Sequence, residues 1–261
     1  MKSVYAAAVL ALMAGFGLDA AAQEGTIAAK VRRWMAEING DIRVDDSGID
    51  GTSIDVDSTL GLDEEEDFDE LHATLGLPII GRFNFQYLRG GYEGTNTLSN
   101  NITFAGTTFT ASTQVDAKVD FESYTLLWQF GAPVPGDIGA GAIAGLKYLV
   151  IDAEVSDSFG NSEEAHVDAP IPVIGAYLRT NLMKFLSLEV QVHGIKYFDT
   201  FGTGVEGTFY DATVALDLKF SGVFVGVGYR WYHFDLSYEN GNDAEVELDL
   251  EGMFFEAGFS F

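Results

Sequence analysis

Hydrophobic and polar residues alternate with a period of two along most of this chain. The alternation is clearest between Arg33 and Val44, where one parity carries Trp34, Ala36, Ile38, Gly40, Ile42 and Val44. The other parity carries polar and charged residues, among them Glu37 and Asp41. Because successive side chains of a strand point to opposite faces, this pattern predicts β-strands with one apolar face each. We therefore expect an all-β protein.

Nine further segments show the same alternation and are separated by turn signals. They cover residues 69–77, 82–87, 115–130, 138–150, 166–179, 185–198, 210–220, 223–231 and 253–261. Short connections at 78–81, 131–137, 180–184 and 221–222 alternate with longer ones at 45–67, 93–114, 154–165, 199–205 and 239–244. This order predicts an antiparallel up-and-down transmembrane β-barrel of about ten strands. Shifts of the boundaries would allow eight or twelve.

In segment 115–130 the alternation changes phase. The upper half has its apolar residues at Val115, Ala117, Val119 and Phe121, whereas the lower half has them at Tyr124, Leu126, Trp128 and Phe130. A β-bulge near Glu122 and Ser123 would produce this change. A strand whose upper part stands above the bilayer would produce it as well.

The first 22 residues predict a secretory signal peptide. Lys2 precedes an apolar stretch from Val4 to Leu18, and small residues follow up to Ala22. The stretch is shorter than the ~20 apolar residues that a spanning helix needs. We expect cleavage after Ala22 and a single domain over residues 23–261. An exported chain without a membrane helix is either soluble or a closed barrel, the other structure that satisfies its backbone in lipid.

The last strand favours the barrel. Its apolar parity carries Met253, Phe255, Ala257, Phe259 and the final residue Phe261. An amphipathic strand with an aromatic last residue resembles the terminal strand of Gram-negative outer-membrane β-barrel proteins. The resemblance implies the bacterial outer membrane, contact with its lipids and lipopolysaccharide, and recognition by the barrel assembly machinery through Phe261. The alternative is a soluble β-domain that ends on an amphipathic strand.

Acidic residues dominate the charge. The chain has 40 Asp and Glu against 14 Lys and Arg, a net charge of −26, and no cysteine. This balance excludes a nucleic-acid binder, and the lack of cysteine excludes a disulfide scaffold and a thiolate metal site. Acids cluster in the predicted external loops, where they would attract divalent cations. We expect no dedicated cofactor, only loosely bound Ca²⁺ or Mg²⁺, with Asp55, Asp57, Asp63, Glu64, Glu65 and Glu66 as candidate ligands. The alternative is a solvated acidic surface.

A second set of charges alternates with apolar neighbours and predicts a polar network in the lumen. Its members are Arg33, Glu37, Asp41, Arg82, Lys147, Glu189, His193, Asp217, Lys219, Arg230 and Glu256. A ten-stranded barrel is slightly wider than the eight-stranded barrels that side chains fill. We therefore expect a lumen that is plugged or nearly so, and not a general porin.

No catalytic motif of the common hydrolase, metalloenzyme or nucleotide-binding families is present. We favour a non-enzymatic role in envelope structure, narrow permeation or surface interaction. The alternative is a hydrolase that acts on lipid A or peptides at the outer rim, with His193 or His233 as the base. Residues 229–235 resemble the late strand of lipid A deacylases, but Asp235 stands where their serine would be. Omptin-type proteases also have ten strands, with an Asp–His pair at the rim.

Overall fold

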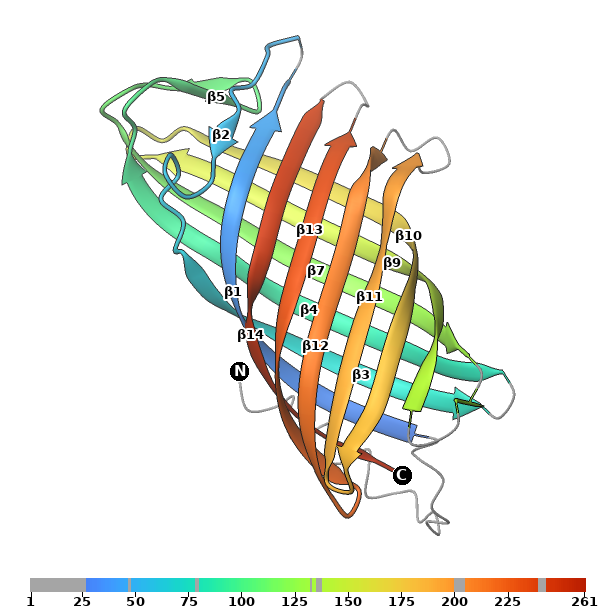
Figure 1. Cartoon of the computed structure of the whole chain (residues 1–261). Coiled ribbons are helices and arrows are strands. Elements are labelled where there is room, and N and C mark those ends of the chain that lie inside the picture. Colours follow the sequence, from blue (N-terminus) through green and yellow to red (C-terminus); the bar gives the residue numbers. More distant parts are fainter. Residues whose placement is uncertain are drawn as a thin grey trace, which may run out of the picture.

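Ten long strands form the body of the protein (Figure 1). The computed structural model describes residues 27–46, 48–77, 80–131, 133–134, 138–199, 205–238 and 243–261. The long strands are β1 (Ile27–Val44), β3 (Glu65–Leu77), β4 (Gly81–Thr97), β7 (Gln114–Phe130), β9 (Ile138–Asp157), β10 (Ser162–Met183), β11 (Leu186–Asp199), β12 (Val205–Phe220), β13 (Val223–Tyr238) and β14 (Ala244–Ser260). Short strands are β2 (Ile54–Asp55), β5 (Ile102–Phe104), β6 (Thr107–Phe109) and β8 (Pro133–Val134).

The long strands close into a barrel. Each pairs antiparallel with its neighbour in the chain, and β14 pairs with β1, with Phe254 opposite Trp34. The prediction of a closed, antiparallel ten-strand barrel is confirmed. No helix in the described part of the chain is long and apolar enough to cross a membrane.

The connections alternate between the two ends of the barrel. β1 begins and β14 ends at the lower end in Figure 1, where the short turns also lie. One of these turns, Ser221-Gly222, has φ values of 46° and 87°, as expected where two residues with positive φ join two strands in a tight hairpin. The longer connections lie at the opposite end. The predicted signal peptide, residues 1–22, lies outside the described residues.

In every long strand the same parity faces inward from end to end, but the polarity of the two faces reverses part of the way up. In β1, the even residues point inward throughout: Arg32 is buried, and so is Trp34. The odd residues point outward, and they change from the exposed Val31 to the exposed Arg33. The lower zone is therefore apolar outside and polar inside, whereas the upper zone is polar outside and apolar inside.

The same inversion explains the phase change in β7. Its pairing with β4 is continuous from Arg82–Gln129 to Thr97–Gln114, so this strand has no bulge. Phe121 faces the interior and Tyr124 faces outward. Of the two explanations offered by the sequence, the structure supports the strand that rises above the bilayer.

The inversion also corrects the predicted lumen set. Arg33, Glu37 and Asp41 lie on the outer surface, and their placement in the lumen was wrong. The apolar residues of the same segment, such as Trp34 and Ile38, fill the interior and do not face lipid. The prediction assumed that the apolar face of every strand meets the membrane, which fails where the strand stands in water.

The apolar lower zone has the height of a membrane. On β9, ten residue steps separate the exposed Ile138 from the exposed Tyr148. At ~3.3 Å per residue and a tilt of ~45°, they span ~23 Å, close to the ~25 Å apolar band of outer-membrane barrels. Aromatic residues mark both edges of the band, as is usual in such proteins: Tyr87, Tyr124, Tyr148, Tyr210 and Trp231 above, and Phe83, Trp128, Phe130, Phe220 and Phe261 below.

The tyrosines at the upper edge donate hydrogen bonds to the first acids above them. The hydroxyls of Tyr87 and Tyr124 both donate to Glu122, at 2.7 Å each. The hydroxyl of Tyr148 donates to Asp168. This edge is where the outer wall passes from apolar to acidic, so it marks the membrane surface on the side of the long connections.

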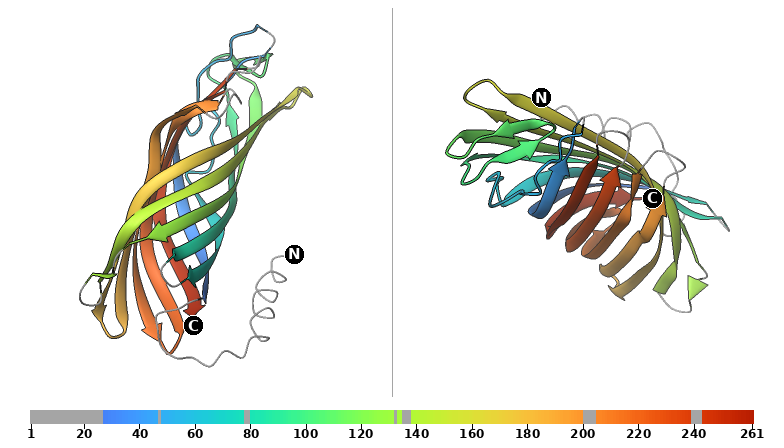
Figure 2. Two further views of the ribbon diagram at one scale, coloured as in Figure 1. Left: turned by 90° about the vertical axis from the view of Figure 1, so that its right-hand side faces the viewer. Right: turned by 90° about the horizontal axis from the view of Figure 1, so that it is seen from above.

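Above the band, the barrel encloses a buried apolar core. Aliphatic side chains of the upper strands fill it, including Ile42, Val119 and Leu248. The connection between β1 and β3 and the β5–β6 hairpin add buried residues from above, among them Val56 and Phe104. Two further views show the walls of strands that surround this core (Figure 2).

Candidate functional site: the barrel interior

A layer of aromatic side chains crosses the lumen at the level of the inversion. Its members are Trp34, Phe68, Tyr92, Phe121, Phe209, Tyr232 and Phe234, all of them buried. Neighbouring ring centroids lie 5.2–6.2 Å apart, so contact is continuous from β1, β3 and β4 through β7 to β12 and β13. Tilted and edge-on ring pairs at such distances are favourable. We call this set the aromatic layer.

A glycine makes room for the aromatic layer. A Cβ added at Gly90 of β4 would lie 2.4 Å from the ring of Phe68. Tyr92, two residues along, donates its hydroxyl to the backbone oxygen of Ala36 at 2.7 Å. Small residues inside the barrel thus admit rings from neighbouring strands.

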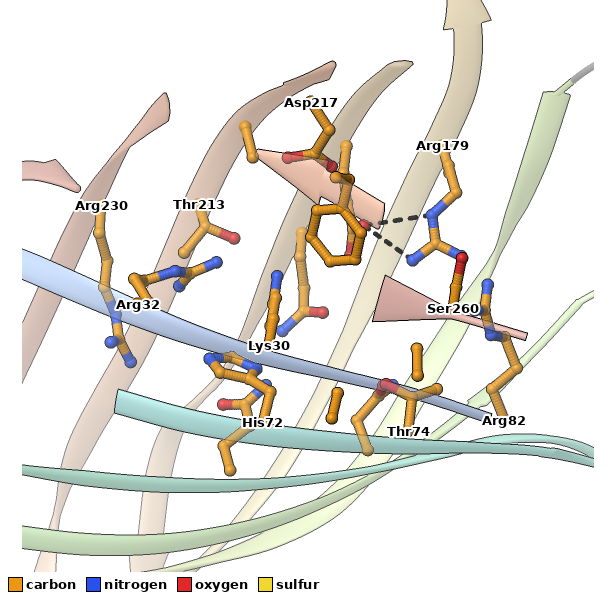
Figure 3. Close-up of a pocket in the computed structure, with 18 of the residues that line it drawn as sticks. Lys30, Arg32, His72, Thr74, Arg82, Arg179, Thr213, Asp217, Arg230 and Ser260 are labelled. Atoms are coloured by element: carbon orange, nitrogen blue, oxygen red, sulfur yellow. Dashed lines mark hydrogen bonds and ion pairs between the residues drawn. The ribbon is translucent and has the colours of Figure 1, made fainter. Parts of the chain in front are cut away.

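Below the aromatic layer lies a polar pocket of about 190 Å³, which we call the lower chamber (Figure 3). Lys30, Arg32, Arg82, Arg179 and Arg230 extend into it from β1, β4, β10 and β13. These side chains point inward because they stand on the inward parity of strands whose other parity meets lipid. The chamber is therefore built by the membrane-spanning part of the barrel.

The deep wall of the lower chamber is a continuous network of ion pairs. Arg230 contacts Asp211 at 2.6 Å and Glu70 at 3.1 Å. Arg32 connects Glu70, at 3.1 Å, to Glu256, at 2.8 Å. Removing one partner from a buried pair of this kind costs ~3–5 kcal/mol, because the other charge is left uncompensated. The network therefore locks five strands together across the lumen.

The network extends at both ends. Lys30 contacts Glu256 at 3.0 Å, and His193 lies 3.7 Å from Asp211. His193 also contacts Gln191, which accepts a hydrogen bond from Gln129 of β7.

Cations also lie against the lower side of the aromatic layer. The guanidinium carbon of Arg230 is 4.7 Å from the Trp34 ring centroid, and the ammonium nitrogen of Lys147 is 5.0 Å from that of Tyr232. Such cation–π contacts are worth more when water is excluded. The layer and the charge network therefore support each other.

Exposure shows which end of the lower chamber is open. The side chains of Lys30, Arg179 and Glu189 are 17%, 20% and 21% exposed. Those of Asp211 and Arg230, nearer the aromatic layer, are 2% and 1% exposed. The chamber thus opens toward the end with the short turns and closes at the aromatic layer.

The structure brings together most of the sequence-predicted lumen residues. Those that lie inside the barrel are Arg82, Lys147, Glu189, His193, Asp217, Lys219, Arg230 and Glu256. Arg33, Glu37 and Asp41 do not join them. Sequence reasoning missed Lys30, Arg32, Glu70, Arg179 and Asp211, which complete the network. A signal was present in β1, where Lys30 and Arg32 share the parity of Trp34.

The candidate metal ligands do not converge. Asp55 of β2 accepts hydrogen bonds from the backbone and hydroxyl of Ser58, and Glu65 stands on the outer face of β3. Among the described residues, which include all six candidates, no group of three or more His, Asp or Glu could hold a metal ion. Divalent binding at the external connections stays a prediction.

Two histidines lie on the outer wall above the membrane edge. His233 contacts Asp249 at 2.7 Å and stacks on Tyr210, with ring centroids 4.8 Å apart. His166 contacts Asp152 at 2.5 Å. Both pairs face away from the lumen, on the strands β13 and β10.

Comparison with known proteins identifies the fold. No protein-family model matches the sequence, and no curated protein matches it. The outer membrane protease OmpT from Escherichia coli superposes with a TM-score of 0.51 at 10% identity, over 94% of this chain and 99% of that one. The chain has the fold of an outer-membrane β-barrel. OmpT is too distant in sequence for its activity to be transferred.

Two autotransporter barrels are similar at lower scores. They are the translocator domain of NalP from Neisseria meningitidis and the transport unit of AIDA-I from Escherichia coli. Their TM-scores are 0.46 and 0.44, at 12% and 10% identity. The NalP comparison covers 100% of this chain and 96% of that one, and the AIDA-I comparison covers 98% and 97%.

Proposed function

We propose that this protein is a sealed surface barrel, which crosses the outer membrane without conducting and displays a rigid acidic extension on the cell exterior. The observation that carries the proposal is the aromatic layer with the buried apolar core above it. A permeation path would have to pass between buried rings that are in mutual contact. Short turns are periplasmic in outer-membrane barrels, so the sealed upper zone stands outside the cell.

The outer wall of the extension supports a role in surface interaction. Above the tyrosines, its exposed acids include Glu37, Asp41, Glu65, Asp67, Asp69, Glu93, Asp116, Asp152, Glu164, Asp168, Asp235, Glu245, Glu247 and Asp249. They are carried by paired strands, and a strand-borne charge is held more rigidly than one on a free loop. Such a wall repels anions and attracts cationic partners.

Conductance of the reconstituted protein tests the seal. We expect purified barrels in a planar bilayer to give no current steps above the bilayer alone. Insertion is checked by flotation with liposomes, and folding by a shift in gel mobility on boiling. Reproducible current steps from inserted, folded barrels would overturn the proposal.

The hydrolase alternative finds no comparable support. His193 is 2% exposed and lies below the aromatic layer, out of reach of a substrate at the outer rim. His233 faces outward from the wall, and it lines neither the lower chamber nor the small pocket around Arg43 and Asp45. We therefore put forward the sealed barrel alone.

A further inference from the structure

Charge is distributed unevenly between the inside and the outside of this protein. Below the aromatic layer, the inward-facing positions of the described strands carry seven of the 14 Lys and Arg residues: Lys30, Arg32, Arg82, Lys147, Arg179, Lys219 and Arg230. They carry five of the 40 acids: Glu70, Glu189, Asp211, Asp217 and Glu256. The interior is therefore cationic in a chain of net charge −26.

A network that only filled the lumen would cost least with equal charge of both signs. Uncompensated charge inside a barrel is costly, because the charged groups lose water. Two excess cations at a solvent-connected pocket therefore suggest an anion from solution as the missing partner.

The cations of the lower chamber differ in the number of carboxylates that pair with them. Arg32 and Arg230 are each held by two carboxylates, and Arg179 is paired with Glu189 through two of its nitrogens. Arg82 and Lys219 also line the lower chamber, but no ion pair or side-chain hydrogen bond joins either of them to another described residue. The unsatisfied positive charge is thus at the open half of the chamber.

Neutral donors stand beside these cations. Asn84 accepts a hydrogen bond from Thr74 at 2.6 Å, which directs its amide nitrogen elsewhere. That nitrogen is buried and has no partner. Ser260 and Thr213 line the same pocket. An arginine fork, an ammonium group and several neutral donors match a tetrahedral oxyanion, which offers acceptor oxygens in several directions.

We propose that the lower chamber binds a small phosphate-bearing solute from the periplasmic side, with Arg82 and Lys219 as its principal cationic contacts. The closed wall of strands keeps lipid headgroups out, so the phosphate is that of a soluble molecule. The aromatic layer ends the path, so the chamber is a binding site and not a channel. Asp217 also lines the chamber, and its carboxylate opposes binding because like charges repel.

Equilibrium dialysis of the full protein in detergent with radiolabelled inorganic phosphate tests the proposal. We expect saturable binding that weakens as salt is raised. Arg82→Gln and Lys219→Gln should each weaken binding about tenfold, the loss expected for one charge-assisted hydrogen bond. Asp217→Asn should strengthen binding, because it removes the opposing charge.

Two matched variants distinguish phosphate binding in the lower chamber from nonspecific attraction of phosphate to cations on the outer face. Arg89→Gln makes the same substitution on the outer face of β4, and Lys196→Gln does so on the outer face of β11. Both should leave binding unchanged. Retained heat-dependent gel mobility shows that each variant is folded. Lack of saturable phosphate binding, or equal losses for Arg82→Gln and Arg89→Gln, would overturn the proposal, whereas the conductance result would stand.

Discussion

At the scale of the residue, adjacent arginines in β1 show how position decides the worth of an ion pair. Arg32 points inward, is 5% exposed and contacts Glu70 and Glu256. Arg33 points outward, is 52% exposed and contacts Asp67 and Asp69. The contacts are of similar length, but water screens only the outer set. Ion pairs in solvent contribute ~0–1 kcal/mol, whereas breaking a buried pair costs ~3–5 kcal/mol.

We therefore expect Arg32→Gln to lower the free energy of unfolding by ~3–5 kcal/mol and Arg33→Gln to change it by less than ~1 kcal/mol. Urea unfolding of the barrel in lipid vesicles, followed by tryptophan fluorescence, measures both. The two variants are each other's control, since they remove the same charge from neighbouring positions. Equal losses would contradict the assignment of the even parity of β1 to the interior.

At the scale of the element, the β9–β10 hairpin is held at its tip by one carboxylate. Asp157 accepts hydrogen bonds from the backbone of Phe159 at 2.8 Å, and from the backbone and side chain of Asn161 at 3.0 and 2.7 Å. Burial raises the pKa of the Asp157 carboxyl, but the bonds from Asn161 and Phe159 outweigh it and hold the pKa below the ordinary 3.8. The charged form is thus favoured in the folded turn.

A depressed carboxyl pKa fixes the sign of the pH dependence. The contribution of Asp157 to the order of this turn is complete above pH ~3.8 and is lost as the pH falls through the lowered pKa. Nuclear magnetic resonance of the barrel in micelles should show the amide signals of Phe159 and Asn161 titrating with a midpoint below 3.8. The Asp157→Ala variant should show no such titration. A midpoint at or above 3.8 would contradict the proposed hydrogen bonds.

At the scale of the whole molecule, the barrel has three stacked zones. The lower zone meets lipid and encloses the lower chamber, the aromatic layer divides the lumen, and the upper zone is an acidic wall around a buried apolar core. Each zone follows from which face of the strands meets water. With the short turns on the periplasmic side, as proposed above, the longer connections lie outside the cell.

The chain has no cysteine, so single cysteines can report this orientation. Ser99 lies in the β4–β7 connection above the barrel, and Ser221 lies in a short turn below it; both are exposed. We expect an impermeant maleimide to label Ser99→Cys on intact cells, and Ser221→Cys only after the outer membrane is permeabilised. Labelling of Ser221→Cys on intact cells would reverse the assigned orientation.

The sequence by itself determined the all-β architecture, a count of about ten long strands and the alternation of short and long connections. These features are local: a period of two, turn residues such as Ser221-Gly222 and an aromatic last strand can be found without knowing which segments pair. The tight hairpin at 221–222 and the ten-strand count are both confirmed.

Only the tertiary structure decided which face of each strand points inward along its full length, because an alternating pattern does not say whether its apolar side meets lipid or a core. The inward face of β1 can be assigned only when the level of the membrane edge is known. Residues of neighbouring strands, such as Tyr87 and Tyr124, mark that level. The charge network is likewise non-local, since Arg32, Glu70, Arg230 and Glu256 come from four strands that meet only when β14 closes on β1.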